Sequence, residues 1–382
     1  MLDVIKKTLF VTNDFGPRTG GIESFIIGLI EHLPYGSTTV YTSSQADTRA
    51  YDATWLESYG VRIIRDRAKI LLPTPRIARR VGAFIRKEQI EVVAFGAAAP
   101  LGLLAPSLRR AGAHRIIALT HGHELWWSKV FPFTVAIRRI GSTLDLLTYL
   151  GRFTGDAIAR SLTPAAASAM VKIAPGIDTE HFRPMDSSQL RESLGLGDKK
   201  VIVCVARLVH RKGQDQLIAA MPVIIKDVPD AHLLLIGEGP YRSHLQSLVK
   251  KYELEGYVSF IGRIQYADLP RYLSLGNIFA MPARSRFFGL EVEGLGIVYL
   301  EASACGLPVI AGASGGAPDA VVQGRTGVVV DGLDKAVIAA AAINMLTHPE
   351  LCQEMGRTGR EWVVEKWRWQ IWADKFAALI ND

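Results

Sequence analysis

Two glutamates eight positions apart are the residues whose type and spacing point most clearly to chemistry. Glu293 lies in a glycine-flanked loop, and Glu301 lies in an apolar run that is typical of a helix. Gly294 and Gly296 let the backbone approach a ligand closely at the start of that helix, where free N–H groups favour anions. An acidic residue in a glycine loop is common, but the pair within a strand, loop, helix and strand is much more specific.

Two cations lie in a comparable place earlier in the chain. Arg207 and Lys212 follow the strand-like run 201–205 and precede a helical run at 214–221. Guanidinium and ammonium groups fixed at the end of a strand and the start of a helix suit a diphosphate. The alternative interpretation is a solvated basic turn.

A glycine pair follows the first expected strand. Gly20 and Gly21 stand between the run 8–12 and the helical run 22–33. A strand, glycine turn and helix in this order hold a phosphate on backbone N–H groups. A glycine pair alone is weak evidence, and its position after the first strand gives it weight.

A histidine follows the expected strand 116–119. His121 stands just past the carboxyl end of that strand, where ligands bind in open α/β sheets. His123 and Glu124 are close in sequence, and a metal site is the alternative interpretation. The spacing disfavours it, because it is not the i, i+4 spacing of a helical zinc site.

These loops require a sheet to position them, and the chain predicts one. Short apolar runs alternate with helical segments, which is the pattern of a parallel sheet covered on both faces. The expected strands are 8–12, 38–42, 61–64, 92–95, 116–119, 146–149, 201–205, 233–236, 258–261, 278–281 and 309–311. The loops named above all follow strands, so they should meet at the carboxyl edge of a sheet.

A chain of 382 residues is too long for one ordinary core, so we expect two α/β domains. The segment 173–184 has the composition of an interdomain crossing. The expected N-terminal Rossmann-like domain spans 1–175 and the C-terminal one spans 176–362. The tryptophan-rich terminal helix, 363–382, is expected to pack back on the first domain.

Composition describes a globular protein, with 49% hydrophobic and 21% charged residues. The three cysteines stand in apolar surroundings with no CxxC motif, which favours a reducing cytoplasm over a disulfide or metal framework. No signal peptide is evident, and the longest uncharged stretch is broken by proline and glycine, so we expect a soluble chain.

Positive charge is concentrated in the first half of the chain. Residues 1–180 hold 22 Lys+Arg and 15 Asp+Glu, whereas residues 181–382 hold 22 of each. The excess predicts an anionic partner for the N-terminal half. A basic nucleic-acid-binding protein is an alternative of a different class, motivated by a pI of about 9.3. The absence of a recognised nucleic-acid motif argues against it.

One basic segment suggests what that partner is. The run 75–87 is an amphipathic helix with Arg76, Arg79 and Arg80 on its polar surface. One interpretation is contact with anionic lipid headgroups; the other is an ordinary solvated helix packed on its sheet. The nearby Trp/Phe cluster at 126–133 is more often packing than function, although beside a basic surface it also suits a membrane interface.

Taken together, these motifs resemble the retaining glycosyltransferases of the two-Rossmann-domain type, family 4, over almost the whole chain. The matching motifs are Gly20-Gly21, His121, 175–178, Arg207 with Lys212, Gly237-x-Gly239, Glu293-x7-Glu301 and Gly315-Gly316. Asp319 departs from the glutamate that is frequent in the family. The resemblance implies the GT-B fold, with two domains facing each other across a cleft.

Within that family, four runs look like the actinobacterial phosphatidylinositol mannoside mannosyltransferases, which use GDP-mannose. The runs are 11–15, 95–100, 120–124 and 293–301. The resemblance implies mannose transfer to a phosphatidylinositol lipid by an enzyme held peripherally at the inner face of the plasma membrane. The alternatives within the family are a UDP-sugar donor or a soluble sugar acceptor.

The resemblance also implies residue roles. Arg207 and Lys212 would hold the diphosphate, Glu301 the ribose and Glu293 the mannose. Further donor contacts are implied at the backbone of Arg263 and Ile264 for guanine, at Gly20 and Gly21 for the β-phosphate, and at Gly294, Leu295 and Gly296. His121 would face the sugar, and Arg76, Arg79 and Arg80 would meet the acceptor membrane.

These roles agree with the chemistry of the reaction. Breaking a glycosyl–phosphate bond builds negative charge on the diphosphate, so fixed cations there stabilise the transition state more than the ground state. We therefore expect no metal cofactor and regard Glu291-Val-Glu293 as unrelated to metal-binding acidic triplets. Our hypothesis for retention is attack from the face of departure; a covalent intermediate on Glu293 is the alternative.

Overall fold

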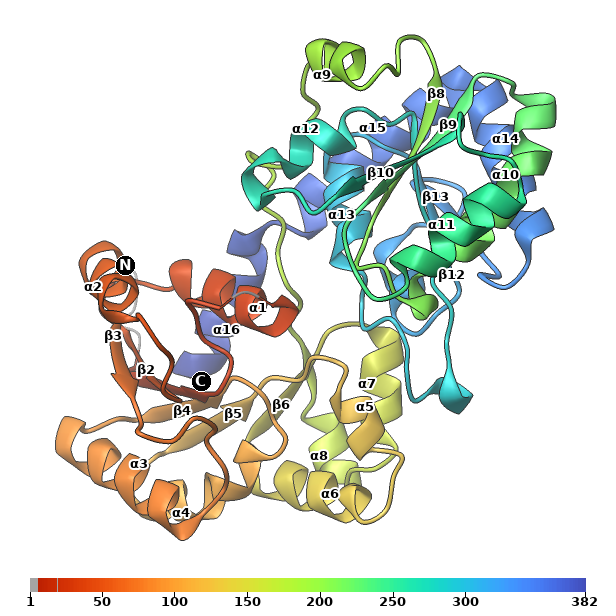
Figure 1. Cartoon of the computed structure of the whole chain (residues 1–382). Coiled ribbons are helices and arrows are strands. Elements are labelled where there is room, and N and C mark those ends of the chain that lie inside the picture. The colour runs from red at the N-terminus through yellow and green to blue at the C-terminus, as the bar shows by residue number, and fades with distance from the viewer. Residues whose placement is uncertain (1–5, 19) are drawn as a thin grey trace. The chain divides into compact units, whose positions relative to one another are not determined.

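The computed structural model describes residues 6–18 and 20–382, and the chain forms two compact units (Figure 1). The first unit runs to Gly176 and resumes with Trp369–Asp382, and the second is Ile177–Arg368. The expected return segment began at 363, but helix α15 (Pro349–Lys366) continues through that position. A Cβ on Gly176 would lie 2.3 Å from the Cα of Trp369, so the two segments pass too closely for any side chain at residue 176.

The first unit is a seven-stranded sheet in which every strand pairing is parallel. Its order is β3-β2-β1-β4-β5-β6-β7. The strands are β1 (Thr8–Thr12), β2 (Thr38–Thr42), β3 (Arg62–Arg65), β4 (Val92–Phe95), β5 (Arg115–Ala118), β6 (Leu146–Tyr149) and β7 (Val171–Lys172). Its central strands are buried on both faces, which is why they appear in the sequence as unbroken apolar runs.

Helices cover both faces of this sheet. Helices α3 (Pro75–Glu88), α4 (Ala105–Arg110) and α6 (Phe133–Thr143) lie side by side along one face (Figure 1). Helix α1 (Gly21–Glu31) packs with the terminal helix α16 (Trp369–Asn381) on the other. The remaining helical segments are α2 (Arg49–Tyr59), η1 (Leu101–Leu104), α5 (Glu124–Trp127), α7 (Arg152–Ala159) and α8 (Pro164–Ser168).

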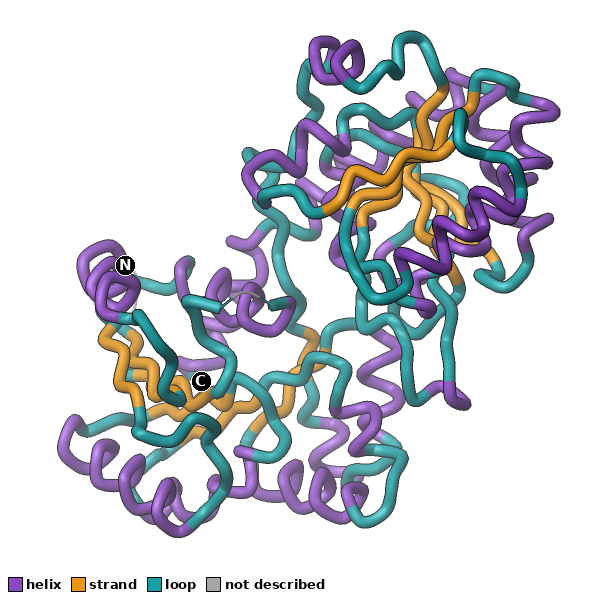
Figure 2. Tube along the Cα trace, viewed as in Figure 1, coloured by secondary structure: helices purple, strands orange, loops and turns teal. Residues whose placement is uncertain are grey.

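The second unit repeats this plan, with strands at its centre and helices around them (Figure 2). Its six parallel strands lie in the order β10-β9-β8-β11-β12-β13. They are β8 (Lys200–Val205), β9 (Ala231–Ile236), β10 (Val258–Gly262), β11 (Ile278–Met281), β12 (Val309–Gly312) and β13 (Gly327–Val330). The helices are α9 (Ser188–Ser193), α10 (Gln214–Asp227), α11 (Arg242–Lys251), α12 (Leu269–Leu273), α13 (Ile297–Ala304) and α14 (Lys335–Thr347), besides α15. Short turns η2 (His210–Lys212), η3 (Tyr266–Asp268), η4 (Phe287–Gly289) and η5 (Ala317–Ala320) complete it.

The predicted fold class is confirmed, and the differences are local. Strands β7 and β13 were not expected: β7 has two residues, and β13 begins at a glycine within a turn-rich stretch. Helix α10 was expected to stop at Met221, but it continues through Pro222 to Asp227. Its later residues pack against α14 and bury Ile224, so packing outweighs the hydrogen bond lost at the proline.

Both sheets have a point where the strand order reverses, and open α/β sheets bind ligands at that point. It lies between β1 and β4 in the first unit and between β8 and β11 in the second. No helix of the described residues is long and apolar enough to cross a membrane.

A buried carboxylate attaches α3 to its sheet. The Asp66 side chain follows β3, is fully buried, and accepts hydrogen bonds from the Tyr41 hydroxyl at 2.6 Å and the Ala68 N–H at 2.8 Å. Arg76 and Arg80 of α3 pair with it at 3.1 and 2.8 Å. Burial alone would raise the pKa of Asp66, but its hydrogen bonds lower that pKa to about 2. Two of the three arginines predicted to meet a membrane therefore have a structural partner.

Replacing Asp66 by asparagine should lower the free energy of unfolding by about 3 kcal/mol, because two arginines and a tyrosine lose a buried anionic partner. Urea unfolding at pH 7 measures this loss. Arg357→Gln is the control, since Arg357 forms exposed ion pairs with Glu354 and Glu361 and its loss should change the free energy of unfolding far less. A loss below about 1 kcal/mol for Asp66→Asn would contradict the proposed attachment.

Candidate functional site

The polar residues of the second unit gather where β8 and β11 end. Gly213 makes this possible: its φ is +77°, and a Cβ there would lie 2.0 Å from the carbonyl oxygen of Pro282. Only glycine therefore lets turn η2 pass directly against the end of β11 and begin helix α10. The N–H of Arg284 donates to the carbonyl of Arg211 at 2.8 Å and ties the same two loops together.

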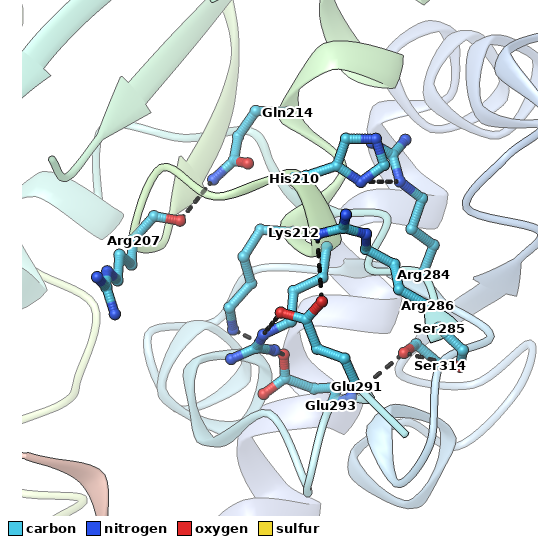
Figure 3. A network of polar contacts seen from close by, with 11 residues as sticks. Arg207, His210, Lys212, Gln214, Arg284, Ser285, Arg286, Glu291, Glu293 and Ser314 are labelled. Atoms are coloured by element: carbon cyan, nitrogen blue, oxygen red, sulfur yellow. Dashed lines mark hydrogen bonds and ion pairs between the residues drawn. The ribbon is translucent and has the colours of Figure 1, made fainter. Parts of the chain in front are cut away.

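The centre of the cluster is the Glu293 carboxylate (Figure 3). Lys212 Nζ donates to Glu293 Oε2 at 2.7 Å, and Arg211 Nη1 donates to the same oxygen at 2.6 Å. Arg211 Nε also lies 3.7 Å from Glu291 Oε1, and Arg286 lies 3.2 Å from Glu291 Oε2. Cations and carboxylates thus alternate along five side chains.

Backbone contacts hold Glu293 in this position. Its N–H donates to Ser314 Oγ at 3.2 Å, and its carbonyl accepts from the N–H of Gly316 at 2.8 Å. Glu293 is 8% exposed. Burial would raise the pKa of this carboxyl, but Lys212 and Arg211 hold it below the ordinary value. Glu293 is therefore ionised at neutral pH.

A second buried ion pair supports the turn. Arg284, 4% exposed, donates from Nη2 to both oxygens of Asp215 at 2.8 and 2.9 Å. Its Nε lies 3.3 Å from Nδ1 of His210. Burial and the neighbouring Arg284 lower the pKa of His210, so its ring is neutral and accepts this hydrogen bond. The pair fixes the start of α10 to the loop after β11.

The structure brings Lys212 and Glu293 together, but Arg207 lies apart from them (Figure 3). Its backbone carbonyl accepts from Gln214, and its side chain is exposed. Among the described residues, no acceptor for the Arg207 guanidinium lies within hydrogen-bond distance. The cation that reaches Glu293 beside Lys212 is Arg211.

Glu301 presents a different environment. It lies within α13, which begins after Gly296 at a φ of +76°, and is 8% exposed. Within the described parts of the chain its carboxylate has no hydrogen-bond or ion-pair partner. Burial raises the pKa of Glu301 to about 7. An unpaired buried carboxyl of this kind suits a ligand that donates hydrogen bonds.

The other predicted donor-site residues occupy the same edge of the second sheet. Arg263 and Ile264 follow β10, with Arg263 exposed, and Gly294, Leu295 and Gly296 form the turn into α13. A Cβ on Gly316 would lie 2.0 Å from the Gly294 carbonyl oxygen, so the two glycine loops are in direct contact. Their role in binding a ligand stays a prediction.

In the first unit, Gly20 and Gly21 begin helix α1 as predicted from their position. A Cβ on Gly20 would lie 2.4 Å from Glu23 Oε2, whereas one on Gly21 would meet nothing within 4 Å. The Glu23 carboxylate also pairs with Arg18 at 3.0 Å. An anion at this helix start would therefore have the Glu23 side chain as a neighbour.

His121 lies past the end of β5, and its Nε2 is hydrogen-bonded to the carbonyl of Gly96 after β4. The backbone N–H of His121 donates to Glu124 Oε2 at 2.9 Å. The Phe25 ring packs edge-on against the His121 ring, with 5.3 Å between the ring centroids. Burial lowers the pKa of His121, so the neutral ring carries its proton on Nε2 and leaves Nδ1 as an acceptor.

A cavity of about 310 Å³ opens at the switch point of the same sheet, between the loops after β1 and β4. Asp14, Ala97, Pro100 and His123 are among its lining residues. Its volume suits one sugar-sized ring. Burial and the nearby Glu23 raise the pKa of Asp14, which lines one wall.

The described residues include no group of three or more His, Cys, Asp and Glu side chains placed to hold a metal ion. Glu291 pairs with arginines instead, and Glu124 pairs with His123 at 3.2 Å. All three cysteines are free thiols, and Cys204 and Cys305 are buried.

Sequence reasoning missed Arg211, Arg286, and the pair of Arg284 with Asp215. The adjacent cations Arg211 and Lys212 were a visible signal, but nothing in their spacing says which one meets Glu293. Arg284 and Asp215 are 69 residues apart, so no local pattern connects them.

Comparison with known proteins gives consistent matches. The profile of the family described as "Glycosyl transferases group 1" matches residues 186–362. The chain is 44% identical over 376 residues to a GDP-mannose-dependent α-(1-6)-phosphatidylinositol monomannoside mannosyltransferase of Mycolicibacterium smegmatis, covering 98% of each chain. It is 43% identical over 385 residues to a Corynebacterium glutamicum enzyme named for the monoacylated form of the same acceptor, covering 99% of this chain and 98% of the relative.

Solved structures agree at the level of fold. HepE of Anabaena, solved with UDP, superposes with a TM-score of 0.82 at 19% identity, covering 98% of this chain and 99% of its own. Sucrose-phosphate synthase of Thermosynechococcus elongatus gives a TM-score of 0.78 at 23% identity, covering 98% of each chain.

The class that the fold and the matches define is that of glycosyltransferases with two Rossmann-like domains, the GT-B fold. The chain belongs to the glycosyl transferases group 1 family. The resemblance to the actinobacterial GDP-mannose-dependent mannosyltransferases is confirmed over nearly the full length.

Replacing Glu301 by glutamine should make stability less dependent on pH. The carboxyl ionises near 4.5 in the unfolded chain and near 7 in the folded one, so its ionisation opposes folding between these values. Stability therefore falls as the pH rises through this window. The glutamine variant should gain up to about 3 kcal/mol relative to the wild type at pH 8 and nothing near pH 4.5.

Urea unfolding of the ligand-free protein at pH 5 and pH 8 measures this difference. If the variant and the wild type differed by the same free energy of unfolding at both pH values, the pKa of Glu301 would not be raised in the folded protein.

Proposed function

We propose that this protein transfers mannose from GDP-mannose to a phosphatidylinositol mannoside lipid, with retention of configuration, at the cytoplasmic face of the membrane. The observation that carries the proposal is the identity of 42–44% over the full chain with enzymes whose names state this donor and acceptor. The ionised Glu293, buried beside two cations, supports it independently.

The proposed binding of the donor follows from the charges at the edge of the second sheet. Arg207 is exposed and Lys212 is buried, and together they would neutralise the diphosphate of GDP-mannose. Glu301 would accept hydrogen bonds from the ribose hydroxyls, and Glu293 from the mannose hydroxyls. Backbone groups at Arg263 and Ile264 would bind the guanine.

Fixed cations act most strongly where charge develops. As the glycosyl bond breaks, negative charge builds on the leaving GDP, and Arg207 and Lys212 stabilise it there. The acceptor hydroxyl would attack from the face of departure and give its proton to a phosphate oxygen. The role proposed for Gly20 and Gly21 is backbone contact with the β-phosphate, and His121 would face the sugar.

Replacing Arg207 by glutamine tests its proposed role in stabilising the leaving GDP. The variant should lower kcat about a hundredfold, the usual effect of removing one preorganised group that stabilises transition-state charge. Thermal stability should be unchanged, because the Arg207 side chain is exposed. The assay supplies GDP-mannose and a panel of phosphatidylinositol lipids, and measures mannolipid formed.

The donor is tested in the wild type by thermal shift. GDP-mannose and GDP should raise Tm, and UDP-sugars should not. Stabilisation by UDP-sugars alone would favour the second candidate within the family, a UDP-sugar transferase.

The acceptor's membrane is proposed to meet the α3–α4 face of the first unit. Arg76 and Arg80 pair with Asp66, which leaves Arg79 as the predicted arginine without a carboxylate partner among the described residues. Arg79 instead lines a groove of about 410 Å³ together with Arg86 and Arg110. These three guanidiniums would bind anionic headgroups, each contributing about 1 kcal/mol.

Apolar side chains in helix α6 and in the turn just before it support the same proposal. Phe131 is 79% exposed and Val135 is 59% exposed, while Arg138 and Arg139 lie one turn after Val135 on the exposed stripe of α6. Exposed aromatic and basic residues together suit a bilayer surface.

Replacing Arg79, Arg86 and Arg110 by glutamine should weaken binding to phosphatidylinositol-containing liposomes about a hundredfold, from three lost headgroup contacts. Sedimentation with liposomes measures it. The matched control removes three exposed cations of the second unit by Lys226→Gln, Lys250→Gln and Lys335→Gln and should keep nearly full binding. Equal losses of liposome binding in both variants would show that binding depends on net charge alone and not on these three arginines.

A further inference from the structure

The Glu293 carboxylate uses its two oxygens unequally. Lys212 and Arg211 both donate to Oε2, and the described residues place no donor on Oε1. A carboxylate oxygen accepts two hydrogen bonds, so Oε2 is saturated while Oε1 stays open. Two cations share one side of the carboxylate, although one would suffice to neutralise it.

The two cations differ in what else holds them. Arg211 presents Nη1 to Glu293 and Nε to Glu291, and Arg286 holds Glu291 from its other oxygen. The Arg211 backbone is tied to the loop after β11 through Arg284. The Lys212 ammonium contacts Glu293 and no other hydrogen-bond acceptor among the described residues. Arg211 is therefore fixed independently of Lys212.

We propose that Arg211 is a positioning residue that keeps Glu293 ionised and in place when Lys212 moves from Glu293 to the diphosphate of the nucleotide. The inference rests on the proposed function, in which Lys212 binds that diphosphate. Oε1 of Glu293 then faces the ligand and accepts from a sugar hydroxyl.

The physical reason is the cost of an unpaired buried charge. Glu293 is 8% exposed, and a carboxylate at that depth is strongly disfavoured without a cation. With Lys212 as its only partner, Glu293 would hold Lys212 back from any phosphate. A planar guanidinium can bind two carboxylates at once in a fixed geometry, which a single ammonium on a flexible stem does less well.

A double-mutant cycle with GDP alone tests the proposal. Arg211→Gln should weaken GDP binding about tenfold or more in the wild-type background, because release of Lys212 now leaves Glu293 unpaired. In the Glu293→Gln background the same change should alter GDP binding less than about twofold, since no carboxylate is left to stabilise. Isothermal calorimetry measures all four affinities.

The pH dependence provides a readout that a purely structural role would not change. The deficit of Arg211→Gln relative to wild type should shrink as the pH falls toward 5. In that variant, once Lys212 has left, burial alone acts on Glu293 and raises its pKa, and the protonated carboxyl needs no cation. Arg211→Lys should restore part of the affinity, since it keeps the charge but loses the contact with Glu291. Arg357→Gln is the control for removing a paired arginine elsewhere and should bind GDP like the wild type.

Each outcome has a distinct meaning. Equal weakening in both backgrounds would show that Arg211 binds the nucleotide itself and would overturn the positioning role. No weakening in the wild-type background would show that Lys212 needs no second cation, and it would leave the proposed donor intact. Failure of the wild type to bind GDP would remove the proposed donor, and the inference with it.

Discussion

The contact of the Glu293 carboxylate, 8% exposed, with Arg211 and Lys212 of one short turn is the interaction on which the proposed ligand-binding edge of the second unit depends. It forms because η2 and the loop before α13 both follow neighbouring strands of a parallel sheet. Gly213 and the buried pair of Arg284 with Asp215 hold the turn against the end of β11. If either failed, Arg211 and Lys212 would no longer be aimed at Glu293.

The two sheets share one organisation but carry different chemistry at their switch points. The second unit gathers ions: Glu293 is paired and ionised, whereas Glu301 has no ion-pair partner in the described part of the chain and has a pKa of about 7. The first unit has a neutral histidine and a small cavity at the corresponding place. This division suits a reaction in which one partner is a charged nucleotide and the other is rich in hydroxyl groups.

The side-chain contacts of the first unit show which of its basic residues are already paired. The net charge predicts an anionic partner for this half of the chain. However, Arg76 and Arg80 form ion pairs with Asp66 that hold α3 on its sheet. Charge available to a partner is thus smaller than charge in the sequence. Three arginines that do not pair with Asp66, namely Arg79, Arg86 and Arg110, line the groove between α3 and α4.

The sequence alone predicted the fold class and most strands, because parallel strands buried on both faces are unbroken apolar runs whose ends are marked by glycine and proline. It also indicated that Lys212, Glu293 and Glu301 belong to loops and helices at one sheet edge. Only the tertiary structure decided that Arg211, and not Arg207, meets Glu293, and that Asp66 holds two arginines of α3. Those contacts depend on side-chain directions and on partners 10 to 82 residues apart, which no local spacing encodes.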